Sequence, residues 1–318
     1  MVPPLVELTR WDQTDGRDIV ESVHGGHVVV VGDGGAVRAR LGDPDHLTFV
    51  RSSVKPFQAA TCLRLLGPAG ADLTAEELAV AWSSHRAEPA QLAAVNRLLD
   101  RSGTAPEDLT TPPDRGEADP GPPPSRLAHN CSGKHALFAL AGAGLGCRAG
   151  CLLDPGGPLQ REVLADLARH VGPVSAVAVD GCGAPVVAVP LVGLARGFWA
   201  LPDLADAAPL LAAGQRRPDL VGGTGRAETA LLAAGVVAKP GAEGVFAATW
   251  ETAAGERLAV AVKVADGAGR AAAALVVAVV AATGGPTVDW HAPPPLGGGR
   301  PAGRVQVVPA VHEAMAAV

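Results

Sequence analysis

The sequence predicts an α/β protein of the α+β type, with one mostly antiparallel sheet built from both ends of the chain and covered by helices. Strand-like runs lie near the two termini, and helix-like segments fill the middle. A chain of 318 residues buries about three quarters of its unfolded surface. A hydrophobic content of 48% excludes a disordered chain. We therefore expect one folded domain spanning residues 1–318.

The first expected strands lie at 18–23, 27–31 and 36–41, which are rich in β-branched residues. The glycine pair Gly25 and Gly26 separates the first two runs, and a glycine-rich segment at 32–35 separates the second from the third. Both separators predict hairpin turns. This part of the chain should therefore form an antiparallel meander.

The middle of the chain predicts helices with clear start signals. One begins near Ser52 or Ser53, and the next begins at Thr74, whose hydroxyl forms a capping-box pattern with Glu77. Further helices are expected from Pro89 to about 103, from Ser132, and at 158–170, 191–201, 204–213 and beyond 225. The proline-rich segment 105–126 predicts a long loop or a soft subdomain boundary.

The C-terminal part should return to the sheet. We expect a buried strand at 174–179, two further strands at 245–249 and 258–264, and an edge strand at 305–308. The apolar run at 269–282 is expected to be a buried helix packed on the sheet.

Composition excludes several classes of function. There are 26 Lys and Arg against 32 Asp and Glu, a net charge of −6, and no basic block, which argues against a nucleic-acid partner. The longest apolar run is shorter than the ~20 residues that a membrane span needs. The absence of tyrosine excludes any tyrosine base or nucleophile.

The five cysteines are an odd number at low density, so we expect thiols in a reducing compartment. Residues 1–10 lack the pattern of a signal peptide. Both observations predict a cytoplasmic protein.

Ser52 and Lys55 form a Ser-x-x-Lys motif at the predicted start of a helix. A spacing of three places both side chains on one helical face. A lysine of lowered pKa could remove the serine proton and activate the hydroxyl as a nucleophile. The alternative is an N-cap serine followed by an exposed lysine.

A second dense polar segment contains Cys131, Lys134 and His135, which share one face if the segment is helical. Cys182 follows Asp180 just after a predicted strand. Two thiolates with a nitrogen ligand suit zinc with one open position. The alternative is a pair of buried structural cysteines with Asp180 in a turn; Cys62, Cys147 and Cys151 are expected to serve packing.

Three other features have weaker implications. Ser84 and His85 close the second helix, where a cap or a polar core contact is expected. Lys263 falls on a predicted strand, where it either faces solvent or acts in a site as a base or an electrostatic clamp. The glycine-rich segment 222–225 before Arg226 is either a tight turn or a backbone nest for an anion, with Arg226 as a carboxylate clamp.

Together these segments resemble the asparaginase II family of the rhizobial type. The matching motifs occur in order from about residue 18 to 272, at 20–24, 51–56, 84–88, 130–135, 180–185, 222–226, 241–244 and 266–271.

The resemblance implies a fold similar to serine β-lactamases and glutaminases, in a homodimer. It implies two serine–lysine pairs around one pocket, Ser52 with Lys55 and Ser84 with Lys263. Ser52 is then a candidate nucleophile, although either serine could take that role.

The resemblance also implies a zinc site on Cys131, Lys134 and Cys182. The supporting residues, expected to bind substrate, are Arg51, His135 and Asp180.

The expected function is therefore that of an L-asparaginase acting on a small-molecule amide. The alternatives are a β-lactamase-like or glutaminase-like serine amidohydrolase, and a non-catalytic amino-acid-binding protein of the same fold. The chain has no Lys-Thr-Gly motif, which the β-lactamase-like enzymes normally carry on a strand.

Overall fold

The computed structural model describes residues 2–119, 121–316 and 318. It confirms a sheet assembled from both ends of the chain: seven strands, all paired antiparallel, in the order β12-β1-β2-β9-β8-β7, with β3 also paired to β2. These strands are β1 (Pro4–Trp11), β2 (Asp18–Val31), β3 (Val37–Leu41), β7 (Val237–Pro240), β8 (Val245–Glu251), β9 (Arg257–Val264) and β12 (Gly303–Val307).

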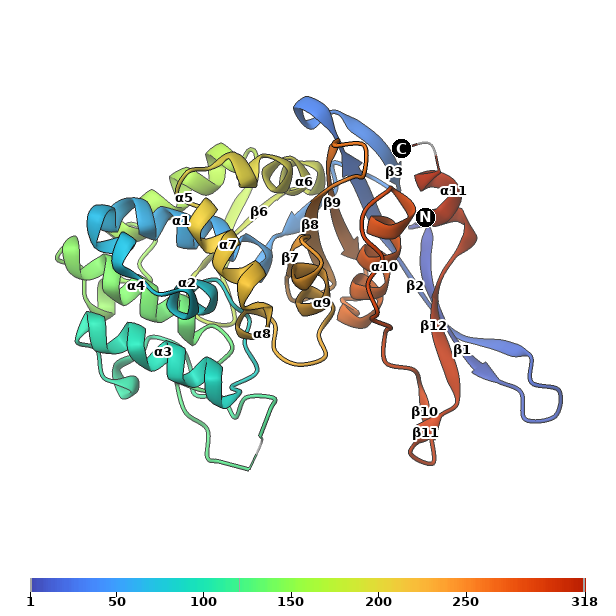
Figure 1. Ribbon diagram of the computed structural model, residues 1–318, viewed down its shortest axis with the longest axis horizontal. Coiled ribbons are helices and arrows are strands. Elements are labelled where there is room, and N and C mark those ends of the chain that lie inside the picture. The colour runs from blue at the N-terminus through green and yellow to red at the C-terminus, as the bar shows by residue number, and fades with distance from the viewer. Residues whose placement is uncertain (1, 120, 317) are drawn as a thin grey trace.

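Both faces of the sheet are buried. Alternate residues of β2, β8 and β9 belong to two separate core clusters; Val29 faces one cluster and Val28 the other. This alternation follows from the two-residue period of a strand. Figure 1 shows α1 to α5 and α7 gathered on one side of the sheet, and α10 and α11 on the other.

The helices on the larger side are mostly those predicted. Their bounds are α1 (Lys55–Leu66), α2 (Ala75–Ala81), α3 (Pro89–Ser102), α4 (Ser132–Gly144), α5 (Pro158–His170), α6 (Leu191–Ala200), α7 (Ala208–Arg216), α8 (Pro218–Val221) and α9 (Ala227–Ala233). The capping box of α2 is confirmed, because Thr74 and Glu77 exchange both hydrogen bonds. On the other side lie α10 (Gly269–Ala282) and α11 (Pro309–Met315).

The hairpin predicted at Gly25 and Gly26 is wrong, because β2 runs straight through both glycines. A Cβ on Gly26 would come within 2.3 Å of the Lys263 carbonyl oxygen on β9. The glycine is therefore needed for the close approach of two strands and not for a turn. The first strand, β1, was not predicted; the hairpin at 32–35 is confirmed by the pairing of β2 with β3.

A second sheet has the order β4-β6-β5, made of β4 (Leu47–Phe49), β6 (Pro185–Pro190) and β5 (Ala176–Val179). The expectation of a buried strand here is wrong, because every residue of β5 is exposed. The strand lies at the edge of its sheet, so its apolar residues do not pack on both sides. A short hairpin, β10 (Leu296–Gly297) and β11 (Arg300–Pro301), lies apart from both sheets.

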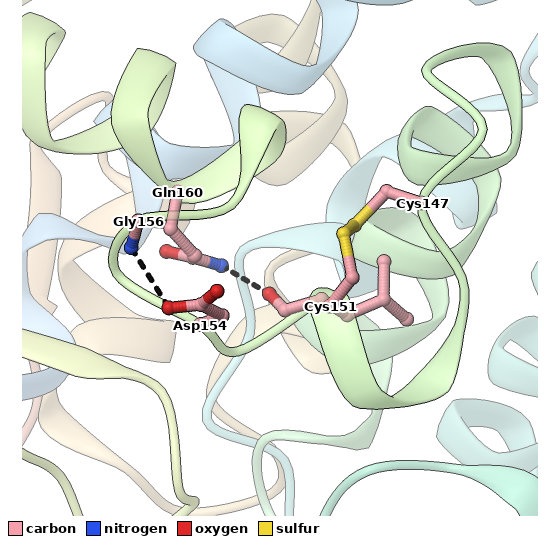
Figure 2. Close-up of a disulfide and its surroundings, with 6 residues drawn as sticks. Cys147, Cys151, Asp154, Gly156 and Gln160 are labelled. Atoms are coloured by element: carbon pink, nitrogen blue, oxygen red, sulfur yellow. Dashed lines mark hydrogen bonds between the residues drawn. A yellow bond between two sulfur atoms is a disulfide. The ribbon is translucent and has the colours of Figure 1, made fainter.

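The expectation of five free thiols is also wrong. Cys147 and Cys151 form a disulfide just beyond the end of α4, whereas Cys62, Cys131 and Cys182 are free and buried. Figure 2 shows the bond beside the turn in which Gln160 donates a hydrogen bond to the Leu152 carbonyl. A spacing of four residues brings the two cysteines together within one local turn, without help from distant segments.

The proline-rich segment 105–126 contains a 3₁₀ turn (Pro106–Asp108) and a bridge between Asp114 and Ser125. Its interpretation as a subdomain boundary stays a prediction. Within the part of the chain that the structure describes, no helix is long and apolar enough to cross a membrane.

Candidate active site

Lys55 is the first residue of α1 and is buried, with 1% of its surface exposed. It follows a 3₁₀ segment, Arg51–Val54, which contains Ser52. Its Nζ donates to the Ser83 carbonyl at 2.5 Å and to Ser84 Oγ at 3.1 Å. The exposed lysine of the alternative interpretation is therefore excluded.

Ser84 lies in the loop that follows α2, and its hydroxyl contacts two amines. Besides Lys55, Lys239 from β7 places its Nζ 2.7 Å from Ser84 Oγ. Lys239 is completely buried and faces the larger, helix-covered side of the sheet. Lys55, Ser84 and Lys239 are called the serine–lysine network below.

The predicted pairing of Ser84 with Lys263 is wrong. Lys263 lies on β9, and its Nζ donates to the Glu243 carbonyl oxygen. It lines a cavity of about 420 Å³ together with Arg51 and Glu243. Lys239, two strands away, takes the place on Ser84 that the prediction gave to Lys263.

Burial acts on both amines of the network. It lowers the pKa of Lys55, although the nearby charge of Cys131 opposes the shift. Burial also brings the pKa of Lys239 well below its usual range, and the positive charge of Lys55 lowers it further. Two amines on one hydroxyl resist a double positive charge, so the network favours a neutral Lys239. A neutral amine at hydrogen-bond distance can accept a proton from Ser84.

Cys131, Lys134 and Cys182 converge as a second buried group, called the thiol cluster below. Cys131 is the residue before α4, Lys134 lies in its first turn, and Lys134 Nζ is 3.2 Å from Cys182 Sγ. The two thiols are hydrogen-bonded to each other, which favours the thiolate at Cys131 and raises the pKa of Cys182.

The thiol cluster fits the donor set of a zinc ion, with two sulfurs, one nitrogen and room for a fourth ligand. The described residues contain no group of three His, Cys, Asp or Glu side chains that could hold a metal. A metal at this position would therefore depend on the lysine nitrogen as its third protein ligand.

The two groups are held together by close backbone packing. Gly133 on α4 lies against α2, where an added Cβ would come within 2.2 Å of the Val80 carbonyl oxygen. Ser132 and His85 join the same two segments, with 2.7 Å between Ser132 Oγ and His85 Nε2. His85 is thus a polar core contact, as expected, and burial lowers its pKa to about 3.

The three residues expected to bind substrate lie in different surroundings. Arg51 and Asp180 bind each other, with 2.5 Å between Nε and Oδ1. Arg51 also has a positive φ of 51°, an uncommon conformation for a non-glycine residue. His135 is buried, bonds Thr110 Oγ1 through Nδ1 at 2.6 Å, and lines a separate cavity that Cys147 also lines.

Ser52 differs from Ser84 in its contacts. It is partly exposed, and its hydroxyl makes no hydrogen bond within the described residues. Lys55 lies three positions later, and side chains at that spacing eclipse in a 3₁₀ segment. Lys55 therefore lies between a free hydroxyl on one side and the bridged hydroxyl of Ser84 on the other.

The family model for L-asparaginase II matches residues 13–307, nearly the whole chain. The protein belongs to the L-asparaginase II family. No curated protein matches the chain at a significant level. Membership supports an amidohydrolase of the asparaginase type that acts on a small-molecule amide.

Lys239 is the residue of this asparaginase-family site that sequence reasoning missed. The signal was present, since a single charge ends the β-rich run at 236–239 and is followed by Pro240 and Gly241. The same argument was applied to Lys263 on β9. Both lysines face the same side of the sheet, but Lys239 alone lies opposite the loop that carries Ser84.

Proposed function

We propose that the protein is an L-asparaginase that hydrolyses L-asparagine to L-aspartate and ammonia through a serine nucleophile activated by lysine. The observation that carries the proposal is the position of Ser84 Oγ between Lys55 and Lys239, with the pKa of both lysines lowered. Family membership supplies the substrate class.

Ser52 is assigned as the nucleophile. Its hydroxyl is partly exposed and free, whereas Ser84 Oγ is occupied by two amines. A bridged hydroxyl suits a relay that passes a proton between Lys55 and Lys239. With the proton held on Lys239, Lys55 is neutral and can act as the base for Ser52.

The reaction balances with these groups alone. Ser52 Oγ bonds to the amide carbon as Lys55 takes the hydroxyl proton, and that proton passes to the leaving nitrogen as the carbon–nitrogen bond breaks. Ammonia leaves and an ester with Ser52 remains. Water, deprotonated by Lys55, attacks the ester carbon and releases aspartate, and Lys55 returns its proton to Ser52.

Zinc and a homodimer belong to the same proposal. Cys131, Lys134 and Cys182 would hold the ion, which as a Lewis acid would polarise bound carbonyl or carboxylate oxygens. Arg51 and Asp180 would then shape the wall beside Ser52, with His135 behind the thiol cluster. A dimer follows from the family resemblance and is checked by light scattering of the purified protein.

The test is ammonia release from a panel of amides including L-asparagine, L-glutamine and a β-lactam, with and without a chelator. L-asparagine should be the preferred substrate, and Ser52→Ala should abolish its hydrolysis. Mass spectrometry of the rapidly quenched enzyme should find an acyl group on Ser52. An acyl group on Ser84 would overturn the nucleophile assignment, and no ammonia release above the Ser52→Ala control would overturn the enzyme itself.

A further inference from the structure

A cavity of about 270 Å³ lies beside the strand end that carries Lys239. It is formed where α9, the end of β7 and the start of α10 meet, and Figure 1 shows these elements side by side. Among its lining residues are Arg226, Glu228, Pro240, Gly241, Arg270 and Trp290. Its volume is below that of pockets for drug-sized ligands and suits a small metabolite.

Glu228 is an acid in this cavity with little to hold its charge. It is 4% exposed, and its carboxylate makes no hydrogen bond within the described residues. Its ion pair with Arg226 is long, with 3.9 Å between Oε1 and Nε. A buried carboxylate without hydrogen bonds is costly unless a ligand supplies the missing donors. Glu228 is therefore suited to bind a cationic group.

The positive groups of the same cavity also have donors to spare. Arg226 Nε is buried and makes no hydrogen bond in the described part of the chain. Arg270 is exposed at the rim and has neither a hydrogen bond nor an ion pair among the described residues. A carboxylate entering the cavity would find donors from both guanidinium groups.

The first turn of α10 adds further donors. This helix has 14 residues, and its N-cap, Ala268, provides no side-chain hydrogen bond. Gly269 and Arg270, the first residues of the helix, line the cavity. Free N–H groups at a helix start attract carboxylates. This cavity thus combines one unpaired acid with several unpaired donors, which matches the two charges of a free amino acid.

We infer that this cavity holds the head group of the substrate, with Glu228 binding the α-ammonium and Arg226, Arg270 and the start of α10 binding the α-carboxylate. The inference rests on the proposed function and names the groups that would select a free amino acid.

The cavity adjoins the serine–lysine network. Pro240 and Gly241 line it directly after Lys239 in the chain, and Lys239 Nζ contacts the Pro240 carbonyl at 3.3 Å. Glu228 and Arg226 both interact electrostatically with Lys239. On its other side, Gly241 packs against Arg51, the neighbour of Ser52, since an added Cβ would lie 3.2 Å from Arg51 Cβ.

The experiment compares three amides that differ only in the head group. L-asparagine carries both charges, succinamate lacks the α-ammonium, and 3-aminopropanamide lacks the α-carboxylate. Ammonia release gives kcat/KM for each, in the wild type and in Glu228→Gln, Arg226→Gln and Arg270→Gln. Glu162→Gln, which removes an exposed carboxylate paired with Arg64 on the helical side, is the matched control.

Glu228→Gln should lower the preference for L-asparagine over succinamate by about tenfold or more, since it removes a charged hydrogen-bond partner of the ammonium. Arg226→Gln and Arg270→Gln should instead lower the preference for L-asparagine over 3-aminopropanamide. Glu162→Gln should change neither ratio. The rim position of Arg270 keeps the test valid if Glu228→Gln fails to fold.

Unchanged ratios in all three variants, with amide hydrolysis retained, would overturn the inference and leave the proposed function standing. If the wild type hydrolyses no amide, calorimetry with L-aspartate decides. Binding that Arg270→Gln or Glu228→Gln weakens would then support the cavity while the proposed function fails. The absence of L-aspartate binding to the wild type would overturn the inference as well.

Discussion

Three buried lysines lie close together in this protein, yet they are held in opposite charge states. In the serine–lysine network, burial lowers the pKa of Lys55 and Lys239. In the thiol cluster, burial alone would lower the pKa of Lys134, but the charges on Cys182 and Cys131 reverse the shift and raise it. The difference lies in the neighbours and not in the depth, since all three are at most 3% exposed. One cluster therefore suits proton transfer, and the other holds a cation between two sulfurs.

Removing the amine of Lys239 should have the largest effect on this comparison. Lys239→Met should lower kcat/KM for L-asparagine by about a thousandfold, because Ser84 loses the amine that accepts its proton. Lys263→Met, from the same face of the sheet, is the matched control. Equal losses in the two variants would show that Lys239 has no special place in proton transfer.

Removing one sulfur should abolish the metal site while leaving the serine–lysine network intact. Elemental analysis should find about one zinc per wild-type chain and almost none in Cys182→Ala, because one nitrogen and one sulfur hold zinc poorly. Cys62→Ala, which removes a buried free cysteine outside the cluster, should keep its zinc. Unchanged zinc in Cys182→Ala would refute the ligand assignment.

The disulfide separates the oxidised sulfurs from the reduced ones and should matter less. Closing a loop of about five residues stabilises the folded state by about 2 kcal/mol in the chain-entropy model. Reduction with dithiothreitol should lower the free energy of unfolding by that amount in denaturant titrations. The double variant Cys147→Ser/Cys151→Ser should not respond to the reductant; a response there would place the sensitive sulfur elsewhere.

His85 adds a pH dependence that belongs to the polar core between the two clusters. Its pKa is about 3 in the folded protein against 6.5 in an unfolded chain, so the unfolded state binds the extra proton between these values. The stability that a neutral His85 supports is complete above pH 6.5 and is lost as the pH falls towards 3.

The expected slope from this residue is about 1.4 kcal/mol per pH unit within that window. Denaturant titrations at several pH values measure it. His85→Gln should remove this part of the slope, whereas His312→Gln, on the exposed C-terminal helix, should leave it unchanged. Identical slopes in both variants would assign the pH dependence to other groups.

The sequence predicted the parts of the fold and site that depend on local signals. The capping box at Thr74, the helix over 158–170 and the buried helix over 269–282 each follow from residues close in the chain. The convergence of Lys134 with Cys182 was also expected.

The failures arose where distant segments decide the outcome. The turn at Gly25 was wrong because the meaning of a glycine pair depends on β9, which lies more than 200 residues later. Lys263 was paired with Ser84 because sequence shows that a lysine lies on a strand but not which strand faces the loop. Glu228 had no local signal, since its burial results from the meeting of α9, β7 and α10.

The contact of Gly133 with Val80 has a consequence for how such an enzyme can change. The two clusters are spaced by one backbone lying directly on another, with no side chain between them to be exchanged. Substitution can alter what each cluster binds, but any residue larger than glycine at 133 would move both at once. Variation in substrate preference should therefore accumulate around the rim of the pocket, while the spacing of its chemical centre is inherited as a unit.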